Sequence, residues 1–358
     1  MIYGQAELHN VEELVPIEGR PGLLMQRVPE SVRTGLLEKG QEQIRRASAI
    51  EIRFGTSVGE EVPVTLASYG GISKVQVFFG DYWVEEVLVG EAPATIVLRE
   101  QTPMFQFAQP YKEKVPRTSF GPIWRLVIQG FEVHLIDLPS VAIRPPYEHE
   151  KPALKYLAYG TSITFGISAS SPDLSYVSQT AWRLGLDPIN LGMPGAAFCE
   201  QAIADHIAAR DDWAIASLCL SVNMLNQGVT AESFAEKARY MVHAIASAHP
   251  DKPLVCIGLF PSFADLGWSW PEREVRATSQ EYREVLQGIV QSSGYSHVHY
   301  VDGRELLDDW RGLSHDLLHP GNAGMIRIGE RLAEFMRPLL HAPAPQTGGR
   351  IKPNHSRE

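Results

Sequence analysis

The 358-residue sequence predicts a chain in which an all-β sandwich precedes an α/β domain with a five-stranded parallel sheet. Two observations predict this order. Up to residue 148, short strand-like segments follow one another with glycine and proline between them and without a convincing long helix. From residue 149 on, apolar strand candidates alternate with helical stretches. That alternation is typical of crossover connections in a three-layer, flavodoxin-like α/β/α arrangement.

In the first region, the strand prediction rests on alternation and on turn residues. Residues 49–54 alternate apolar and polar side chains, as a half-buried strand does. Gly80 and Asp81 separate two strand-like segments and suit a two-residue hairpin turn. The predicted strands are 49–54, 75–79, 82–89, 95–98, 124–128 and 131–136. Together they indicate an antiparallel sandwich.

Residues 145–152 predict the domain boundary. Three prolines and four ionisable residues stand within these eight positions, a composition typical of a linker. We therefore expect a β-sandwich domain over 1–148 and an α/β domain over 149–341. The polar tail, 342–358, is expected to be disordered.

The elements of the second domain follow from apolar runs and helical periodicity. The expected strands are 154–159, 188–191, 215–220, 254–259 and 298–301. The expected helices are 174–185, 197–210, 231–248, 272–293 and 323–340. Five such strands with intervening helices predict one parallel sheet covered on both faces.

Composition excludes several classes of protein. The net charge is −10 without a long run of one sign, which argues against a nucleic-acid partner. The three cysteines, Cys199, Cys219 and Cys256, form no CxxC pair, so we expect neither a disulfide framework nor a zinc site. The N-terminus lacks the features of a secretory signal, and no apolar run is long enough to span a membrane. A cytoplasmic location is the expectation.

Polar and small residues stand where the strands of the second domain end. Ser162 follows the first strand as a candidate nucleophile, although a serine there can also cap the next helix. Gly192 and Gly195 follow the second strand and leave the backbone bare, so that an N–H can approach a ligand, unless this segment is a plain loop. Asn223 follows the third strand, as a turn former or as a side-chain donor.

Asp316 and His319 stand three residues apart before the last predicted helix. The carboxylate can hold one ring nitrogen and leave the other to take a proton, or the two are surface polar residues. Acyl transfer needs a nucleophile, a base, an orienting carboxylate and donors for an oxyanion. Because one domain supplies all four, the set indicates an acyl-transfer site.

These blocks resemble the SGNH, or GDSL-type, hydrolases. The nucleophile block is similar to residues 160–166, and the other three correspond to Gly192, Asn223 and the Asp316–His319 pair. The resemblance spans about 155–340. A jelly-roll-like β domain before such a domain is similar to a two-domain subgroup of carbohydrate esterases and acyltransferases.

The resemblance implies a catalytic set of Ser162, Asp316 and His319. It implies that the oxyanion is held by the N–H groups of Ser162 and Gly192 and by the Asn223 amide, and that neither a metal nor a cofactor is needed. Three positions depart from the family pattern: Thr161 stands for the usual aspartate, and Ser221 and Met224 for a glycine and an aspartate. These departures put the subfamily and the substrate in doubt.

The expected substrate is a small-molecule ester or an acylated carbohydrate. Trp268 and Trp270 follow the fourth strand and either line a pocket or pack to hold their loop, and Met193 and Met224 are further pocket candidates. The expected reaction is removal of a short, acetyl-like acyl group. An acyltransferase would use the same residues, and a non-catalytic carbohydrate-binding protein is the alternative from another class. The sequence leaves a homo-oligomer open.

Two further arrangements have weaker support. A nucleophilic Cys199 lacks an evident partner. His297 and His299 alternate on a strand and could share a metal, but such a pair is more often structural.

Overall fold

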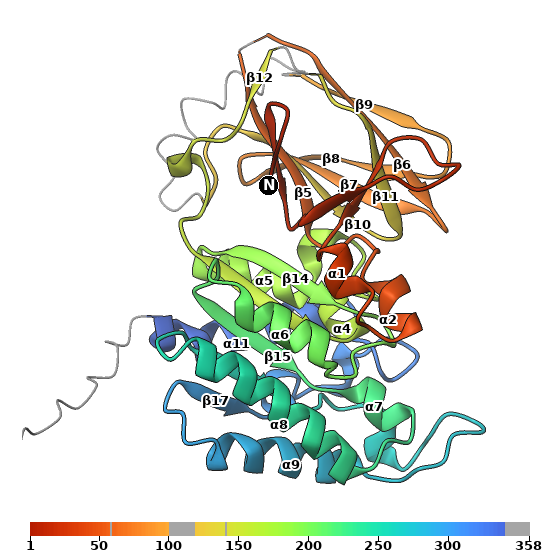
Figure 1. Cartoon of the computed structure of the whole chain (residues 1–358), viewed down its shortest axis with the longest axis vertical. Helices are drawn as coiled ribbons and strands as arrows, with labels where there is room; N and C mark the ends of the chain where they lie inside the picture. Colours follow the sequence, from red (N-terminus) through yellow and green to blue (C-terminus); the bar gives the residue numbers. More distant parts are fainter. Residues whose placement is uncertain (58, 100–118, 140–141, 341–358) are drawn as a thin grey trace, which may run out of the picture.

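The computed structural model describes residues 1–57, 59–99, 119–139 and 142–340 (Figure 1). Antiparallel sheets form one end of the molecule, and a parallel sheet with its helices forms the other. The tail predicted to be disordered, 342–358, lies outside the described residues.

Two antiparallel sheets face each other in the N-terminal part, as predicted. Among the described residues, one sheet has the order β1-β2-β5-β10-β7-β8 with β12 paired to β5, and the other has the order β3-β4-β11-β6-β9. Apolar side chains such as Ile52, Leu66 and Leu126 fill the space between them. The first sheet contains β1 (Ile2–Tyr3), β2 (Ala6–His9), β5 (Ile50–Thr56), β7 (Ser73–Phe79), β8 (Tyr82–Val89), β10 (Trp124–Gln129) and β12 (Ile143–Arg144). The second contains β3 (Glu13–Val15), β4 (Leu23–Gln26), β6 (Val62–Tyr69), β9 (Ala94–Leu98) and β11 (Glu132–Asp137).

The parallel sheet has the order β14-β13-β15-β16-β17, and every pair in it is parallel. Its strands are β13 (Lys155–Gly160), β14 (Asp187–Gly192), β15 (Ile215–Cys219), β16 (Leu254–Ile257) and β17 (Val298–Val301). The chain runs from β13 to one side and then returns to the other side of β13. Ligands bind beyond the carboxyl ends of the strands at such a switch point.

Helices cover both faces of this sheet because its side chains alternate between two apolar cores (Figure 1). Leu157 and Tyr159 pack with α6 (Gln201–Ala209), α8 (Ala231–Ala248) and α9 (Ser279–Ser292). Tyr156 and Ala158 pack with α5 (Tyr176–Leu184) and α11 (Asn322–Leu340). The predicted three-layer fold is confirmed. Helix α9 begins later than predicted because Thr278 and Glu281 form a capping box at its start.

Two short helices within the β-rich region were not predicted. The helices α1 (Glu30–Arg33) and α2 (Glu38–Gln43) leave the sandwich and lie against the α/β part (Figure 1). Leu36 and Ile44 are buried in the same core as Leu191 and Ile203. The remaining short elements are α4 (Ser162–Phe165), α7 (Val222–Asn226), α10 (Gly303–Leu306), η1 (Glu148–Glu150), η2 (Pro172–Leu174), η3 (Phe263–Leu266) and η4 (Trp310–Gly312). None of the described helices is long and apolar enough to cross a membrane.

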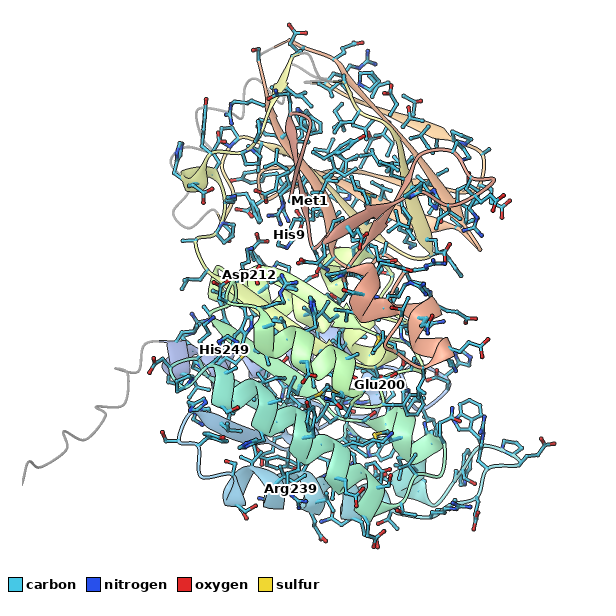
Figure 2. The ribbon with its side chains drawn as sticks, in the orientation of Figure 1. Met1, His9, Glu200, Asp212, Arg239 and His249 are labelled. Carbon is cyan, nitrogen blue, oxygen red and sulfur yellow. The ribbon has the colours of Figure 1, made fainter. Side chains whose placement is uncertain are left out.

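A buried ionic network joins the antiparallel sheet to the parallel one. Arg53 is fully buried and donates to both oxygens of Asp187, at 2.7 and 2.6 Å, and to Glu51 at 2.8 Å. Figure 2 places His9 at this junction, where its Nε2 lies 2.7 Å from the Pro188 carbonyl oxygen. Glu7, His9 and Asp187 could approach one metal ion. The Arg53 guanidinium, however, already neutralises these carboxylates.

Candidate active site

The candidate nucleophile lies in a tight turn between β13 and α4. Ser162 is the first residue of α4, and Thr161 caps that helix with Oγ1 accepting from the Ile163 N–H at 3.3 Å. A Cβ on Gly160 would lie 2.2 Å from Thr164 Oγ1, so only glycine fits the end of β13. The threonine that replaces the family's usual aspartate therefore has a local structural role, and the turn presents Ser162 at the switch point of the sheet.

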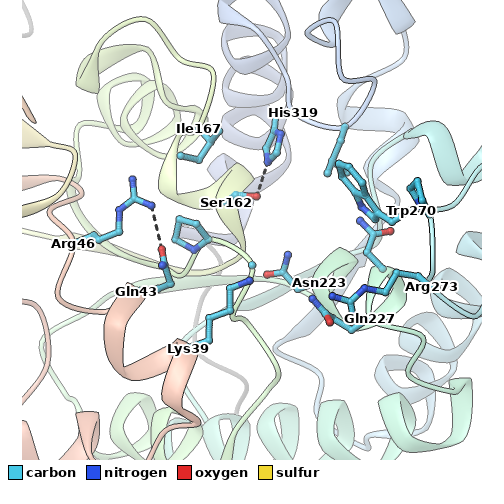
Figure 3. A pocket seen from close by; sticks show the side chains of 15 residues that line it. Lys39, Gln43, Arg46, Ser162, Ile167, Asn223, Gln227, Trp270, Arg273 and His319 are labelled. Atoms are coloured by element: carbon cyan, nitrogen blue, oxygen red, sulfur yellow. Dashed lines mark hydrogen bonds between the residues drawn. The ribbon is translucent and has the colours of Figure 1, made fainter. Parts of the chain in front are cut away.

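Ser162, His319 and Asp316 form a continuous hydrogen-bonded chain. Ser162 Oγ lies 2.7 Å from His319 Nε2 (Figure 3). On the other side of the ring, His319 Nδ1 lies 2.6 Å from Asp316 Oδ2. With Nδ1 protonated toward the carboxylate, Nε2 can accept the proton of the serine hydroxyl. The structure thus brings together the three residues that the sequence singled out as a catalytic set.

The second oxygen of Asp316 holds its own loop. Asp316 Oδ1 accepts from the N–H groups of Leu318 and His319, both at 3.0 Å, and from the Ser314 hydroxyl at 2.7 Å. Burial raises the pKa of Asp316, but the hydrogen bonds from His319, Ser314 and Leu318 outweigh it and hold that pKa well below its usual range. The carboxylate is therefore ionised and fixed in orientation.

Asn223 lies in α7, directly after β15, and its amide is held by the loop that follows β14. Its Oδ1 accepts from the Ala197 N–H at 3.2 Å, and the Ser221 hydroxyl donates to the Ala197 carbonyl. Among the described residues no acceptor is found for Asn223 Nδ2, and Asn223 lines the cavity beside Ser162. The serine in place of the family's usual glycine thus anchors the same loop as Asn223.

The structure corrects the prediction for Gly192. Its N–H donates to Asn190 Oδ1 at 2.8 Å, and a Cβ there would lie 2.3 Å from the backbone nitrogen of Phe165. Gly192 is the last residue of β14 and packs under α4, so its N–H is not open to a ligand. Gly195, three residues later, lines the cavity with a φ of +64°, and its N–H has no acceptor among the described residues.

A cavity of about 550 Å³ opens at Ser162 (Figure 3). Trp270 lines it, whereas Trp268 lines a smaller adjoining pocket of about 110 Å³. Met193 and Met224 are fully buried in the core between the sheet and α6, so the prediction that they line the pocket was wrong. Their apolar side chains point into this core and away from the cavity. The other residues around the cavity are Lys39, Gln43, Arg46, Ile167, Pro194, Gly195, Asn223, Asn226, Gln227, Pro271, Arg273, Leu318 and His319.

The N-terminal part supplies one wall of this cavity. Lys39, Gln43 and Arg46 come from α2 and the residues after it, and sequence reasoning missed all three. The same part supports α4 from below, where Ser48 Oγ and Gln129 Nε2 both donate to the Phe165 carbonyl at 2.9 Å. Helix α2 is too short for its periodicity to be recognised in the sequence. A cluster of basic and amide residues between predicted strands was the one signal that could have indicated cavity-lining residues here.

The two weaker arrangements have structural explanations. Cys199 is buried, and burial raises the pKa of its thiol far above the usual range, so it is no thiolate at neutral pH. His297 Nε2 lies 3.2 Å from the Ala246 carbonyl oxygen, and its ring contacts Tyr295. The geometry therefore favours the structural interpretation of the His297–His299 pair.

Comparison with known proteins adds the family. No curated protein matches the chain in sequence. Among solved structures, the chain resembles the salicylyl-acyltransferase SsfX3 from a tetracycline biosynthetic pathway, at 19% identity and a TM-score of 0.75 over 94% of this chain and 95% of that one. It also resembles a family two carbohydrate esterase from Clostridium thermocellum in complex with cellohexaose, at 15% identity and a TM-score of 0.59 over 83% of this chain and 94% of that one.

A third structure, the acetyl xylan esterase Est2A from the rumen bacterium Butyrivibrio proteoclasticus, matches at 10% identity and a TM-score of 0.55 over 95% of this chain and 96% of that one. At these identities the likeness concerns the two-part fold. The sequence model of the GDSL-like lipase/acylhydrolase family matches residues 154–337, more than half of the chain. The chain therefore belongs to the GDSL-like lipase/acylhydrolase family.

Proposed function

We propose that this protein is a serine ester hydrolase that removes a short, acetyl-like acyl group from an alcohol or a sugar ester. The observation that carries the proposal is the 2.7 Å approach of Ser162 Oγ to His319 Nε2 at the wall of the cavity. Asp316 supports it, because its carboxylate lies 2.6 Å from the other ring nitrogen.

In this mechanism, Ser162 Oγ attacks the ester carbonyl carbon while His319 Nε2 takes the hydroxyl proton. The carbonyl oxygen becomes an oxyanion, and the N–H groups of Ser162 and Gly195 and the Asn223 amide donate to it. The intermediate collapses, and His319 gives its proton to the leaving alcohol. Water then attacks the acyl-enzyme in the same way and releases the carboxylic acid. Each oxyanion donor is worth about 3–4 kcal/mol of barrier.

The lining of the cavity supports a short acyl group. Most of its lining residues are polar or charged, although apolar atoms, among them those of Ile167, Pro194, Trp270, Pro271 and Leu318, make up the larger part of its exposed surface. A long acyl chain needs a continuous apolar channel, because each buried CH₂ contributes about 0.8 kcal/mol. The exposed Trp270 ring, beside the polar lining, is suited to stacking on a sugar.

An acyltransferase remains the second candidate. The cavity of about 550 Å³ has room for an acceptor alcohol beside an acyl-enzyme. The similar structures include a salicylyl-acyltransferase as well as carbohydrate esterases, so the fold is compatible with both reactions. A non-catalytic carbohydrate-binding role would leave the aligned Ser162, His319 and Asp316 without a purpose.

The test is labelling by a serine-directed phosphonate, followed by peptide mass mapping. We expect a label on Ser162 that a prior incubation with substrate slows, and no label in Ser162→Ala. A series of nitrophenyl esters of increasing chain length then measures the acyl preference. Product analysis with and without an acceptor alcohol separates hydrolysis from transfer. A protein that hydrolyses none of these esters and is not labelled at Ser162 contradicts the proposal.

A further inference from the structure

Three cationic side chains line the cavity of the candidate active site. Lys39, Arg46 and Arg273 line the cavity, and no aspartate or glutamate does so among the described residues. Lys39 and Arg46 lie on one wall and Arg273 on the opposite wall, with Ser162 between them (Figure 3). Because the whole chain has a net charge of −10, composition does not explain this positive cavity.

The cations on the two walls are not neutralised by protein carboxylates. Within the described part of the chain, neither Lys39 nor Arg273 takes part in an ion pair. Arg46 donates to the Gly130 carbonyl at 3.0 Å and to Gln43 Oε1 at 3.1 Å, both uncharged acceptors. Its guanidinium also packs on aromatic rings rather than on an acid. The positive charge is therefore available to a ligand.

Lys39 reaches the centre of the site. A Cβ placed on Gly195 would lie 2.8 Å from Lys39 Nζ, so the ammonium lies directly beside the backbone of Gly195. Gly195 is the proposed oxyanion donor. A charged group a few atoms from the ester carbonyl would thus come within reach of Lys39.

A fourth cation lies beneath this wall. Arg27 is fully buried and donates to the carbonyl oxygens of Asn190, Gly192 and Gln43 at 2.9, 3.0 and 3.0 Å, without a carboxylate partner. Burial, with a smaller contribution from Arg46, lowers the pKa of Arg27 to about 9. Arg27 therefore stays charged at neutral pH and adds to the positive potential of the wall that contains Gln43.

We propose that the substrate of this site is an anionic ester, with a carboxylate, phosphate or sulfate group that Lys39 on one wall or Arg273 on the other binds. This inference rests on the proposed esterase function and specifies its substrate class. A neutral ester would leave all three cations of the cavity without a counter-charge. The anionic group belongs to either the acyl part or the alcohol part of the ester. Because each wall has at least one cation, either part can place its anionic group beside a cation.

Two pairs of esters distinguish these sources. In the acyl pair, 4-nitrophenyl glutarate has a free carboxylate that its methyl ester lacks. In the alcohol pair, 4-acetoxybenzoate has a carboxylate that methyl 4-acetoxybenzoate lacks. We expect kcat/KM to be at least about tenfold higher for the anionic member of one pair, with the advantage shrinking as added salt screens the charges. Equal kcat/KM within both pairs overturns the proposal.

Charge-removing variants assign the effect to the walls. We expect Lys39→Gln or Arg273→Gln, whichever removes the cation that binds the anionic group, to lower kcat/KM for the preferred anionic ester by about fivefold more than for its neutral partner, as expected for a partly exposed ion pair. Arg239→Gln is the matched control, because Arg239 is an exposed cation on α8 (Figure 2). Losses of the same size for anionic and neutral esters contradict the proposal.

Binding separates this inference from the esterase proposal. Ser162→Ala is titrated calorimetrically with the amides that match the four esters, which cannot be hydrolysed as esters are. Tighter binding of an anionic amide than of its neutral partner supports the inference even if no ester is hydrolysed. Equal affinities overturn it even if Ser162 proves to be a nucleophile.

Discussion

Ser162 Oγ and His319 Nε2 lie 2.7 Å apart although 157 positions of the chain separate them. The parallel sheet produces this approach. Ser162 follows β13, the strand next to the switch point, and the loop before α11 brings His319 over the same edge of the sheet. The pair depends on Asp316, which holds the ring from the other side.

Asp316→Asn is expected to lower kcat by about 10³- to 10⁴-fold, because an amide no longer selects the tautomer in which Nε2 accepts a proton. Steady-state kinetics on a nitrophenyl ester measure the loss. Asp309→Asn serves as the control, since Asp309 is the half-buried cap of η4 and has no proposed role in the mechanism. A kcat for Asp316→Asn within tenfold of the unmodified protein would remove Asp316 from the mechanism.

Asn223→Ala is expected to lower kcat by about 100-fold or more with little change in KM, because the amide acts on the oxyanion and not on the bound ester. Asn226→Ala is the matched control, since Asn226 lines the same cavity and has no proposed role at the oxyanion. If KM rises instead while kcat holds, Asn223 binds the substrate in its ground state.

The two glycines after β14 are expected to respond differently to alanine. Gly192→Ala places a Cβ 2.3 Å from the Phe165 nitrogen, so we expect a cost of about 3 kcal/mol or more in unfolding free energy. Gly195→Ala meets only the flexible end of Lys39 but has a φ of +64°, so we expect a cost of about 1–2 kcal/mol together with a fall in kcat. Urea unfolding and kinetics on both variants test this; a fully active Gly195→Ala would argue against its N–H as a donor.

Arg53→Met is expected to destabilise the protein by about 3–5 kcal/mol, because it leaves the buried carboxylate of Asp187 without its guanidinium partner and Glu51 with Arg125 alone. Urea denaturation at neutral pH measures the loss. Arg311→Met should have no measurable effect, since that side chain is exposed and pairs only at the surface. A similar stability for both variants would mean that the network adds nothing to the junction.

Stability is expected to fall between pH 7 and pH 5, in part because of His206. Burial and, to a smaller extent, Arg210 lower the pKa of His206 to about 4. Between about pH 6.5 and pH 5, the unfolded chain therefore binds a proton at His206 that the folded protein does not bind. His206→Gln should therefore reduce the pH 7 to pH 5 difference in unfolding free energy by about 2 kcal/mol. If His206→Gln leaves the pH 7 to pH 5 difference in unfolding free energy unaltered, His206 does not cause the loss of stability.

The order of strands in the α/β part could be predicted because each strand is a compact apolar run between turn residues. β17 and α8 begin and end at the predicted residues. Strands β2, β3 and β6 were missed because they are short or contain proline and polar residues, and cross-strand partners rather than local pattern specify them.

In the site, the sequence singled out residues that the structure brings together, but it misjudged side-chain direction. Met193 and Met224 are next to cavity residues in sequence and point the opposite way, into the core. Gly192 was chosen over Gly195 because both glycines follow the apolar run of the predicted strand, and the sequence does not show that the Gly192 N–H is already bonded to Asn190. Lys39, Gln43 and Arg46 could not be placed, since their position depends on how α2 packs against a distant helix.

The path of α1 and α2 has a consequence for protein engineering. A fragment beginning at residue 149 would match the family boundaries but would lose Lys39 and Arg46 and uncover the apolar surface that Leu36 and Ile44 now shield. The α/β part is therefore not expected to keep its complete cavity when it is produced without the N-terminal part. Swapping the leading half for that of a relative would replace Lys39, Gln43 and Arg46 in the cavity wall.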